Sequence, residues 1–165
     1  MIASGGAGIV ISSMAGHMFP PVDAEQEHAL AHTPTDELLA LPFLTDTENM
    51  GGAAYGYAKR GNHLRVQAQS LRWGERGARV NAISPGIIIT PLARDEMSGP
   101  GAANYQKMIE TSATGRVGTP DEVAAAAAFL LGPEAGFITG ADLLMDGGVI
   151  AALRAGRWSL AGAGS

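Results

Sequence analysis

Tyr55 and Lys59 lie four residues apart, immediately before a long amphipathic stretch. A helix places positions i and i+4 on one face, so a single face can present a phenol and an ammonium group together. A nearby cation favours the phenolate form, which suits a tyrosine that donates and accepts a proton near neutral pH. Upstream, a segment typical of a buried strand ends in Ser12 and Ser13. The pair alone is a weak motif, so the surrounding elements decide whether it forms a site.

Those elements predict an α/β fold. The apolar, β-branched run at 8–13 is typical of a strand in a parallel sheet that is covered on both faces. Two further strands are expected at 79–84 and 141–146. Apolar periodicity and end signals predict helices at 53–73, 102–111 and 120–131. The β-α-β-α-β order implies parallel strands with right-handed crossovers.

The composition narrows the class of protein. A chain of 165 residues, 46% hydrophobic and 16% charged, can form one domain with its own core. The sequence contains no run of roughly 18 apolar residues, so no transmembrane helix is expected. Cysteine is absent, which excludes disulfides and cysteine-bound metals, and the net charge of −5 argues against binding to nucleic acid. The absence of cysteine is compatible with the cytoplasm, where we expect the protein to act.

Residues 20–50 differ from the rest because they hold seven acids and no lysine or arginine. The segment 33–37, Thr-Pro-Thr-Asp-Glu, has the composition of a capped helix start, so we expect a helical insertion here. His28 and His32 have the spacing of a metal-binding pair. No third ligand is evident in the sequence, and a solvated helix face is the favoured interpretation. No metal site is expected.

The serine-bearing strand, the Tyr-x-x-x-Lys helix and the Pro-Gly turn after the second strand together resemble the catalytic half of the short-chain dehydrogenase/reductase family. The resemblance covers nearly all of residues 1–150. It implies that Ser13 hydrogen-bonds the substrate oxygen, that Tyr55 is the general acid/base, and that Lys59 holds the nicotinamide ribose and favours ionised tyrosine. It also implies hydride transfer between NAD or NADP and an alcohol or carbonyl compound, without a metal.

The resemblance assigns a cofactor-binding role to the turn at 85–90. In the family, the backbone near Ile88 and the side chain of Thr90 contact the cofactor carboxamide and phosphates. Pro85 and Gly86 end the strand and open the crevice at its carboxyl end, where doubly wound sheets bind ligands. The expected cofactor-binding residues are Tyr55, Lys59, Pro85, Gly86, Ile88 and Thr90. Residues 91–110 match the family's mobile substrate loop.

Two departures from the family pattern matter. Ser13 and Tyr55 are 42 positions apart, which is longer than usual and resembles the branch of bacterial 3α-hydroxysteroid dehydrogenase/carbonyl reductase. A steroid-like substrate is therefore one candidate, and in that branch the insertion covers the helix face used for oligomerisation. The second departure is that no strand precedes the glycine-rich segment 5–8, which also lacks the third glycine of a phosphate-binding turn.

The sequence therefore predicts that residues 1–150 form the C-terminal half of a Rossmann-like doubly wound sheet. Residues 151–165 are expected to form an irregular tail. NAD and NADP cannot be distinguished, because the discriminating segment belongs to the other half. We expect the chain alone to be inactive, and the alternative to an enzyme is a catalytically silent remnant or interaction module. The strand at 8–13 would keep a free apolar edge, which favours a homo-oligomer or pairing with another strand.

Overall fold

Three parallel strands form the centre of the protein. The computed structural model describes residues 2–18, 22–45 and 52–159. The strands are β1 (Ala7–Ile11), β2 (Arg79–Pro85) and β3 (Asp142–Met145), in the order β1-β2-β3. Both pairings are parallel, as the element order predicted, and the α/β fold is confirmed.

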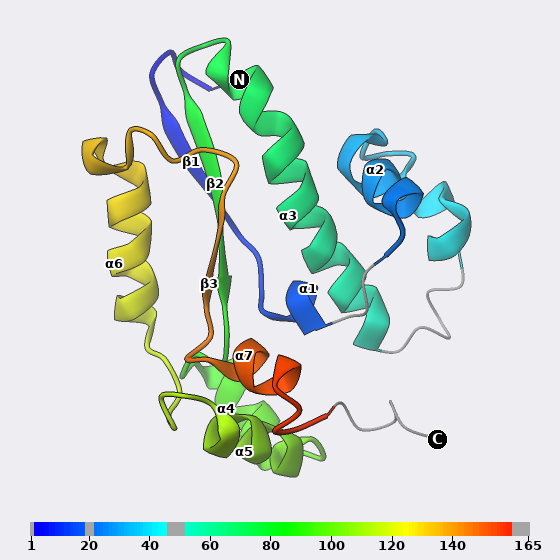
Figure 1. The fold of residues 1–165 in the computed structure, drawn as a ribbon, viewed down its shortest axis with the longest axis vertical. Helices are drawn as coiled ribbons and strands as arrows, with labels where there is room; N and C mark the ends of the chain where they lie inside the picture. The colour runs from blue at the N-terminus through cyan, green and yellow to red at the C-terminus, as the bar shows by residue number, and fades with distance from the viewer. Residues whose placement is uncertain (1, 19–21, 46–51, 160–165) are drawn as a thin grey trace.

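Helices cover both faces of this sheet, with α3 (Gly52–Gly74) on one side and α6 (Pro120–Leu131) on the other (Figure 1). Alternate residues of β2 point to opposite faces. Ala82 packs with Val66 of α3, and Ile83 packs with Leu130 of α6. The remaining helices are α1 (Ala15–Met18), α2 (Ala24–His32), α4 (Pro91–Ser98), α5 (Ala102–Thr111) and α7 (Val149–Arg154).

The helix starting at Pro120 begins as its sequence predicted. Thr119 caps the first turn, and the Glu122 carboxylate accepts a hydrogen bond from the Thr119 backbone N–H, which completes a capping box. At the other end, the Arg79 guanidinium of β2 donates hydrogen bonds of 2.9, 2.9 and 3.2 Å to the carbonyls of Leu130, Gly132 and Ile138. A cation at a helix C-terminus also interacts favourably with the helix dipole. Arg79 thus fastens α6 and the loop that follows it to the sheet.

The insertion is helical, but the helix lies earlier than expected. Asp23 caps α2 in a capping box with Gln26, whereas Thr33 is the residue at which this helix ends. The prediction of a helix start at 33–37 is therefore wrong. Over the described residues 34–45 the chain forms only two single 3₁₀ turns, at Leu38–Ala40 and Pro42–Leu44, because Pro42 has no N–H with which to continue a helix from the first turn.

Two arginines of α3 hold the acidic insertion in place. Arg60 forms an ion pair with Glu27 of α2, and Arg65 donates a hydrogen bond to the carbonyl of Thr33. The excess of acids in this segment is therefore matched in part by cations that lie on the helix it covers. The part of the insertion at 46–51 falls outside the described residues.

The expectation of an irregular tail at 151–165 is wrong for its first part. Asp146 accepts hydrogen bonds from the backbone N–H groups of Gly148 and Ile150, which starts α7 before that point. Beyond the helix, Trp158 is 6% exposed and donates a hydrogen bond of 3.2 Å to the carbonyl of Val149. A buried tryptophan anchors this segment against α7. Residues 160–165 fall outside the described part of the chain.

One cluster of polar side chains lies between α1, α3 and the sheet. It consists of His17, His63, Ser84 and Asp142, which come from four different elements. Burial lowers the pKa of His63 to about 4, even though the carboxylate of Asp142 acts in the opposite direction. Burial alone would raise the pKa of Asp142, but hydrogen bonds from His17 and Ser84 hold that pKa below its ordinary value. At neutral pH the cluster therefore contains an uncharged His63 and a carboxylate.

β1 lies at an edge of the sheet. Among the described residues its strand partner is β2 alone, and Ile11 at its carboxyl end is 52% exposed. Oligomerisation through this edge remains a prediction. None of the described helices has the length and apolar character needed to cross a bilayer.

Candidate active site

A cleft of about 650 Å³ opens at the carboxyl ends of β1 and β2. Its walls come from the ends of these strands and from α1, α3, α4 and α5. Of the seven residues predicted for the site, six line the cleft: Ser13, Tyr55, Pro85, Gly86, Ile88 and Thr90. The seventh, Lys59, lies one helical turn beyond Tyr55 on α3.

The two serines after β1 have different surroundings. Ser12 is 4% exposed and donates a hydrogen bond of 2.9 Å to the carbonyl of Lys59, so it ties the strand end to α3. Ser13 lines the cleft and accepts a hydrogen bond of 3.2 Å from the backbone N–H of Ala15. A hydroxyl has one proton to donate and two lone pairs. Ser13 thus keeps a donor for another oxygen, while the N–H of Ala15 orients its side chain.

Tyr55 and Lys59 face each other on α3. The Lys59 ammonium nitrogen lies 5.4 Å from the centre of the Tyr55 ring, and it donates a hydrogen bond of 3.4 Å to the carbonyl of Ile11. This hydrogen bond joins the lysine to the end of β1. Since an ammonium group has three donors, others remain for a ligand. Tyr55 is 55% exposed, so its phenol is accessible from the cleft.

The turn after β2 is held by its neighbours. A Cβ at Gly86 would lie 2.6 Å from the Cα of Asp146, so only glycine allows the ends of β2 and β3 to approach this closely. Ile88 forms a parallel bridge with Gly118, in which Gly118 bonds to the carbonyl of Ile87 and the N–H of Ile89. In such a bridge the N–H and C=O of the central residue point away from the partner. The backbone groups of Ile88 are therefore directed away from Gly118.

Thr90 has a structural function as well as a place on the cleft wall. Its hydroxyl accepts a hydrogen bond of 3.1 Å from the N–H of Ala93 and so caps α4. The same wall carries a polar pair that the sequence did not reveal: Tyr105 donates a hydrogen bond of 2.8 Å to the carboxylate of Glu96. Burial and this hydrogen bond raise the pKa of Tyr105 to about 12. Met14 and Met108 contribute apolar surface nearby.

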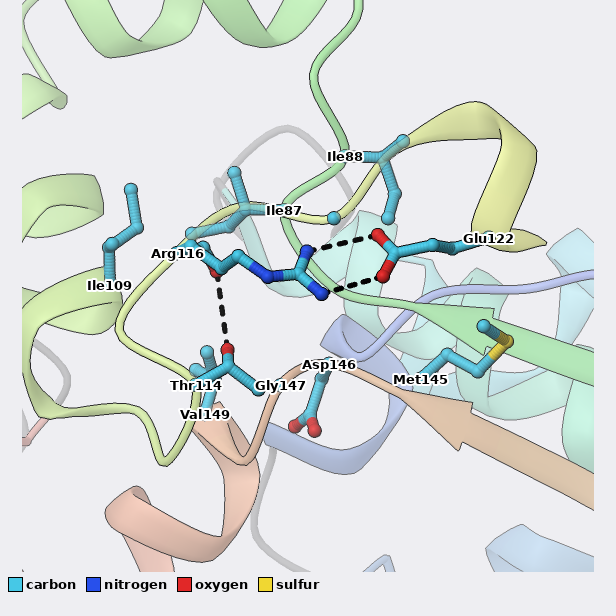
Figure 2. Close-up of a pocket in the computed structure, with 11 residues that line it drawn as sticks. Ile87, Ile88, Ile109, Thr114, Arg116, Glu122, Met145, Asp146, Gly147 and Val149 are labelled. Carbon is cyan, nitrogen blue, oxygen red and sulfur yellow. Dashed lines mark hydrogen bonds and ion pairs between the residues drawn. The ribbon is translucent and has the colours of Figure 1, made fainter.

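A smaller hollow of about 200 Å³ lies beside the cleft, and Figure 2 shows its walls. Arg116 makes two hydrogen bonds to the carboxylate of Glu122, at 2.6 and 3.0 Å, across this hollow. These hydrogen bonds, with one from the Thr119 backbone, lower the pKa of Glu122 to about 2. Both charges are already paired, which indicates that these residues stabilise the loop before α6.

Comparison with known proteins identifies the family. A family model described as enoyl-(acyl carrier protein) reductase matches residues 37–150, which is more than half of the chain. The chain belongs to the short-chain dehydrogenase/reductase family.

Three relatives illustrate the similarity. The chain is 42% identical over 154 residues to the short-chain dehydrogenase/reductase bsc3 of Alternaria brassicicola, covering 93% of this chain and 56% of the relative. It is 33% identical over 152 residues to 3-alpha-hydroxysteroid dehydrogenase/carbonyl reductase of Comamonas testosteroni, covering 90% and 57%. The crystal structure of 3-alpha-hydroxysteroid dehydrogenase from Pseudomonas sp. B-0831 with NADH superposes with a TM-score of 0.72 at 32% identity, covering 90% and 57%. The chain thus spans little more than half the length of these relatives.

Proposed function

We propose that this chain forms the catalytic part of an NAD(P)-dependent oxidoreductase that interconverts an alcohol and a ketone or aldehyde. The observation that carries the proposal is the shared cleft of Ser13, Tyr55 and the turn at 85–90, with the Lys59 ammonium beside the Tyr55 ring. The cofactor, when bound, supplies the acceptor or donor of hydride. The residues of the chain bind the substrate oxygen and transfer its proton.

In the proposed mechanism, the Ser13 hydroxyl donates a hydrogen bond to the substrate oxygen, using the proton that its contact with Ala15 leaves available. Tyr55 takes the hydroxyl proton of an alcohol as hydride leaves the adjacent carbon, and returns it in the reverse reaction. The phenolate is the form of Tyr55 that accepts this proton and the form that remains after the proton is returned, and the positive charge of Lys59 favours it. Ser12 keeps α3 in position through the carbonyl of Lys59.

The residues present suit one end of a nicotinamide cofactor. A carboxamide needs one donor and one acceptor, and the backbone N–H and C=O of Ile88 can provide both because they point away from Gly118. Lys59 can donate to the ribose hydroxyls. Among the described residues no strand precedes β1, so no strand–turn–helix unit is available there for the pyrophosphate. We therefore propose that this chain contacts the nicotinamide-ribose end of the cofactor only.

The cleft also favours a particular kind of substrate. Methionines and Leu92 give it apolar surface, whereas Tyr105 and Glu96 form a polar pair on the same wall. This combination supports a ketone or secondary alcohol with an apolar body, and the similarity to hydroxysteroid dehydrogenases supports a steroid-like compound.

Binding experiments test the cofactor assignment on the chain itself. Reduced nicotinamide mononucleotide and NADH should bind with similar, weak affinity, because the additional adenosine phosphate of NADH gains no contact. Lys59→Met should weaken both. NADH binding that is more than about tenfold tighter, or binding that is insensitive to Lys59→Met, would contradict this assignment.

Turnover is tested in a chimera in which the N-terminal part of the Comamonas testosteroni relative precedes this chain. We expect the chimera to reduce a carbonyl compound, and the chain alone to show no turnover. Tyr55→Phe should lower the rate at least ~100-fold, as expected for loss of a general acid/base. Tyr57→Phe is the matched control, because Tyr57 packs near Phe43, with ring centres 6.0 Å apart, outside the cleft lining. Equal rates for the two variants would exclude the proposed role of Tyr55.

The alternative is a chain without catalytic function that pairs through the edge of β1. The exposed Ile11 at that edge favours this alternative. A chimera that folds and binds NADH but shows no turnover dependent on Tyr55 would support it over the enzyme.

A further inference from the structure

The buried cluster of His17, His63, Ser84 and Asp142 contains the donor set of a transition-metal site. The Nε2 atoms of His17 and His63 lie 2.7 and 3.6 Å from the same carboxylate oxygen, Oδ2 of Asp142. The two imidazole rings have centres 4.5 Å apart. Among the described residues this is the single group of three or more such side chains whose ligand atoms converge, all within 4.8 Å.

We propose that His17, His63 and Asp142 bind a divalent transition-metal ion of the Zn²⁺ class, which fastens α1 and α3 to the sheet. Two imidazoles and a carboxylate suit zinc, whereas calcium and magnesium prefer oxygen ligands. Ligand atoms at 2.0–2.2 Å from a tetrahedral zinc are about 3.3 Å apart. The distances of 2.7 and 3.6 Å from the two histidines to the carboxylate bracket this value, and Nε2 of His63 would exchange its 2.8 Å contact with Ser84 for the metal.

The charges and hydrogen bonds of the cluster support a cation at this position. The side chain of Asp142 is only 10% exposed, and its ion-pair partners among the described residues are histidines, not lysine or arginine. A buried carboxylate without a permanent cation is costly. Ser84 donates a hydrogen bond of 2.7 Å to Oδ1 of Asp142, which orients the carboxylate with Oδ2 toward the two histidines. Such outer partners are typical of metal-binding carboxylates.

A serine–histidine–aspartate catalytic site is the other interpretation of these residue types, and the geometry excludes it. Ser84 is 0% exposed, so no substrate can reach its hydroxyl. Ser84 and Asp142 also approach the same nitrogen of His63, Nε2, at 2.8 and 3.6 Å. A catalytic triad requires the carboxylate on the opposite ring nitrogen.

The affinity of the site has a structural limit. A histidine that binds metal through Nε2 carries its proton on Nδ1, and Nδ1 of His63 has no hydrogen-bond partner in the described part of the chain. Loss of this outer contact typically costs 10–100-fold in metal affinity. We therefore expect binding that is weaker by roughly that factor than at a site with a complete set of outer partners. His17 is the most exposed ligand, at 17%, and provides the entry path.

The chain carries its own control, because its four histidines form two pairs. His28 and His32 also have ring centres 4.5 Å apart, but both are exposed on α2 and no group of three ligands includes them among the described residues. Replacing either pair removes the same number of imidazoles. Only one replacement should remove the proposed site.

The test is titration of the tag-free 165-residue chain with ZnCl₂ by calorimetry, and with Co²⁺ by absorption spectroscopy. We expect one Zn²⁺ per chain, an intense tetrahedral Co²⁺ spectrum, and the same results for the His28→Gln/His32→Gln variant. His17→Gln and Asp142→Asn should each weaken binding at least tenfold, with folding verified by circular dichroism. Absence of saturable binding at one ion per chain would overturn the proposal. Loss of the Co²⁺ spectrum in the His28→Gln/His32→Gln variant, or an octahedral spectrum in the wild type, would also overturn it.

Discussion

Gly16 provides a sharp test of the way α1 is packed against the helix that carries Tyr55 and Lys59. A Cβ at Gly16 would lie 2.9 Å from both the backbone nitrogen of Arg60 and the carbonyl carbon of Lys59, and 2.5 Å from Cε1 of His63. Two of these atoms belong to the backbone of α3, so rotation of a side chain cannot relieve the overlap. Gly16→Ala must therefore push α1 and α3 apart.

The magnitude follows from two opposing effects. Carbon contacts are favourable near 3.5–4.0 Å, so the helices must separate by roughly 0.6–1 Å, and overpacking of this kind costs about 1–3 kcal/mol. Alanine also lowers the conformational entropy of the unfolded chain, which by itself would raise the free energy of unfolding by about 0.4–1 kcal/mol. We expect Gly16→Ala to lower the free energy of unfolding by about 1–2 kcal/mol.

Urea denaturation followed by circular dichroism measures this change. The matched control is Gly74→Ala at the end of α3, where a Cβ would meet no atom within 4 Å. This control should be neutral or stabilise the fold by up to about 1 kcal/mol. A Gly16→Ala variant that unfolds within about 0.5 kcal/mol of the wild type would refute the close contact of α1 with α3, since uncertainties in such measurements are of that order.

Two further predictions concern charged and titrating groups. Arg79→Met leaves three main-chain carbonyls without their cationic donor and should cost about 2–4 kcal/mol in urea denaturation, whereas Arg157→Met at an exposed position should change stability by less than about 0.5 kcal/mol. The raised pKa of Tyr105 means that the folded state retains a proton which the unfolded state loses first, so its contribution to stability is present below pH 10 and lost as pH rises toward 12. In an ultraviolet titration, Glu96→Gln should shift the ionisation of Tyr105 back toward its ordinary value, and an unchanged titration would show that the hydrogen bond has no effect.

Local sequence patterns were sufficient for most of the secondary structure. Short segments with apolar residues predicted all three described strands, and the cap at Thr119 located the start of α6, because caps and periodicity depend on residues within a few positions of one another. The same patterns were wrong at Thr33, where a capping residue and a proline stand at the end of α2 instead of the start of a helix. An end signal of this kind is ambiguous when the neighbouring helix has its own cap, here Asp23.

The pairing of Tyr55 with Lys59 could likewise be predicted from the sequence, because one helix places both on the same face. The different surroundings of Ser12 and Ser13 could not be predicted from the sequence, because they depend on which of the two serines contacts α3. The sequence pattern after residue 150 also did not predict α7, because this helix depends on hydrogen bonds to Asp146 and on the burial of Trp158.

The sequence by itself determined the parallel α/β architecture, the resemblance to a dehydrogenase family and the candidates for proton transfer, because these depend on short-range periodicity and on motifs within single elements. Only the tertiary structure brought His17 to Asp142, which lies 125 positions away in the chain. It alone also placed Tyr105 and Glu96 on the wall of the cleft. Such contacts depend on how separate helices and strands pack against one another. The spacing of residues within a single helix or strand does not predict this packing.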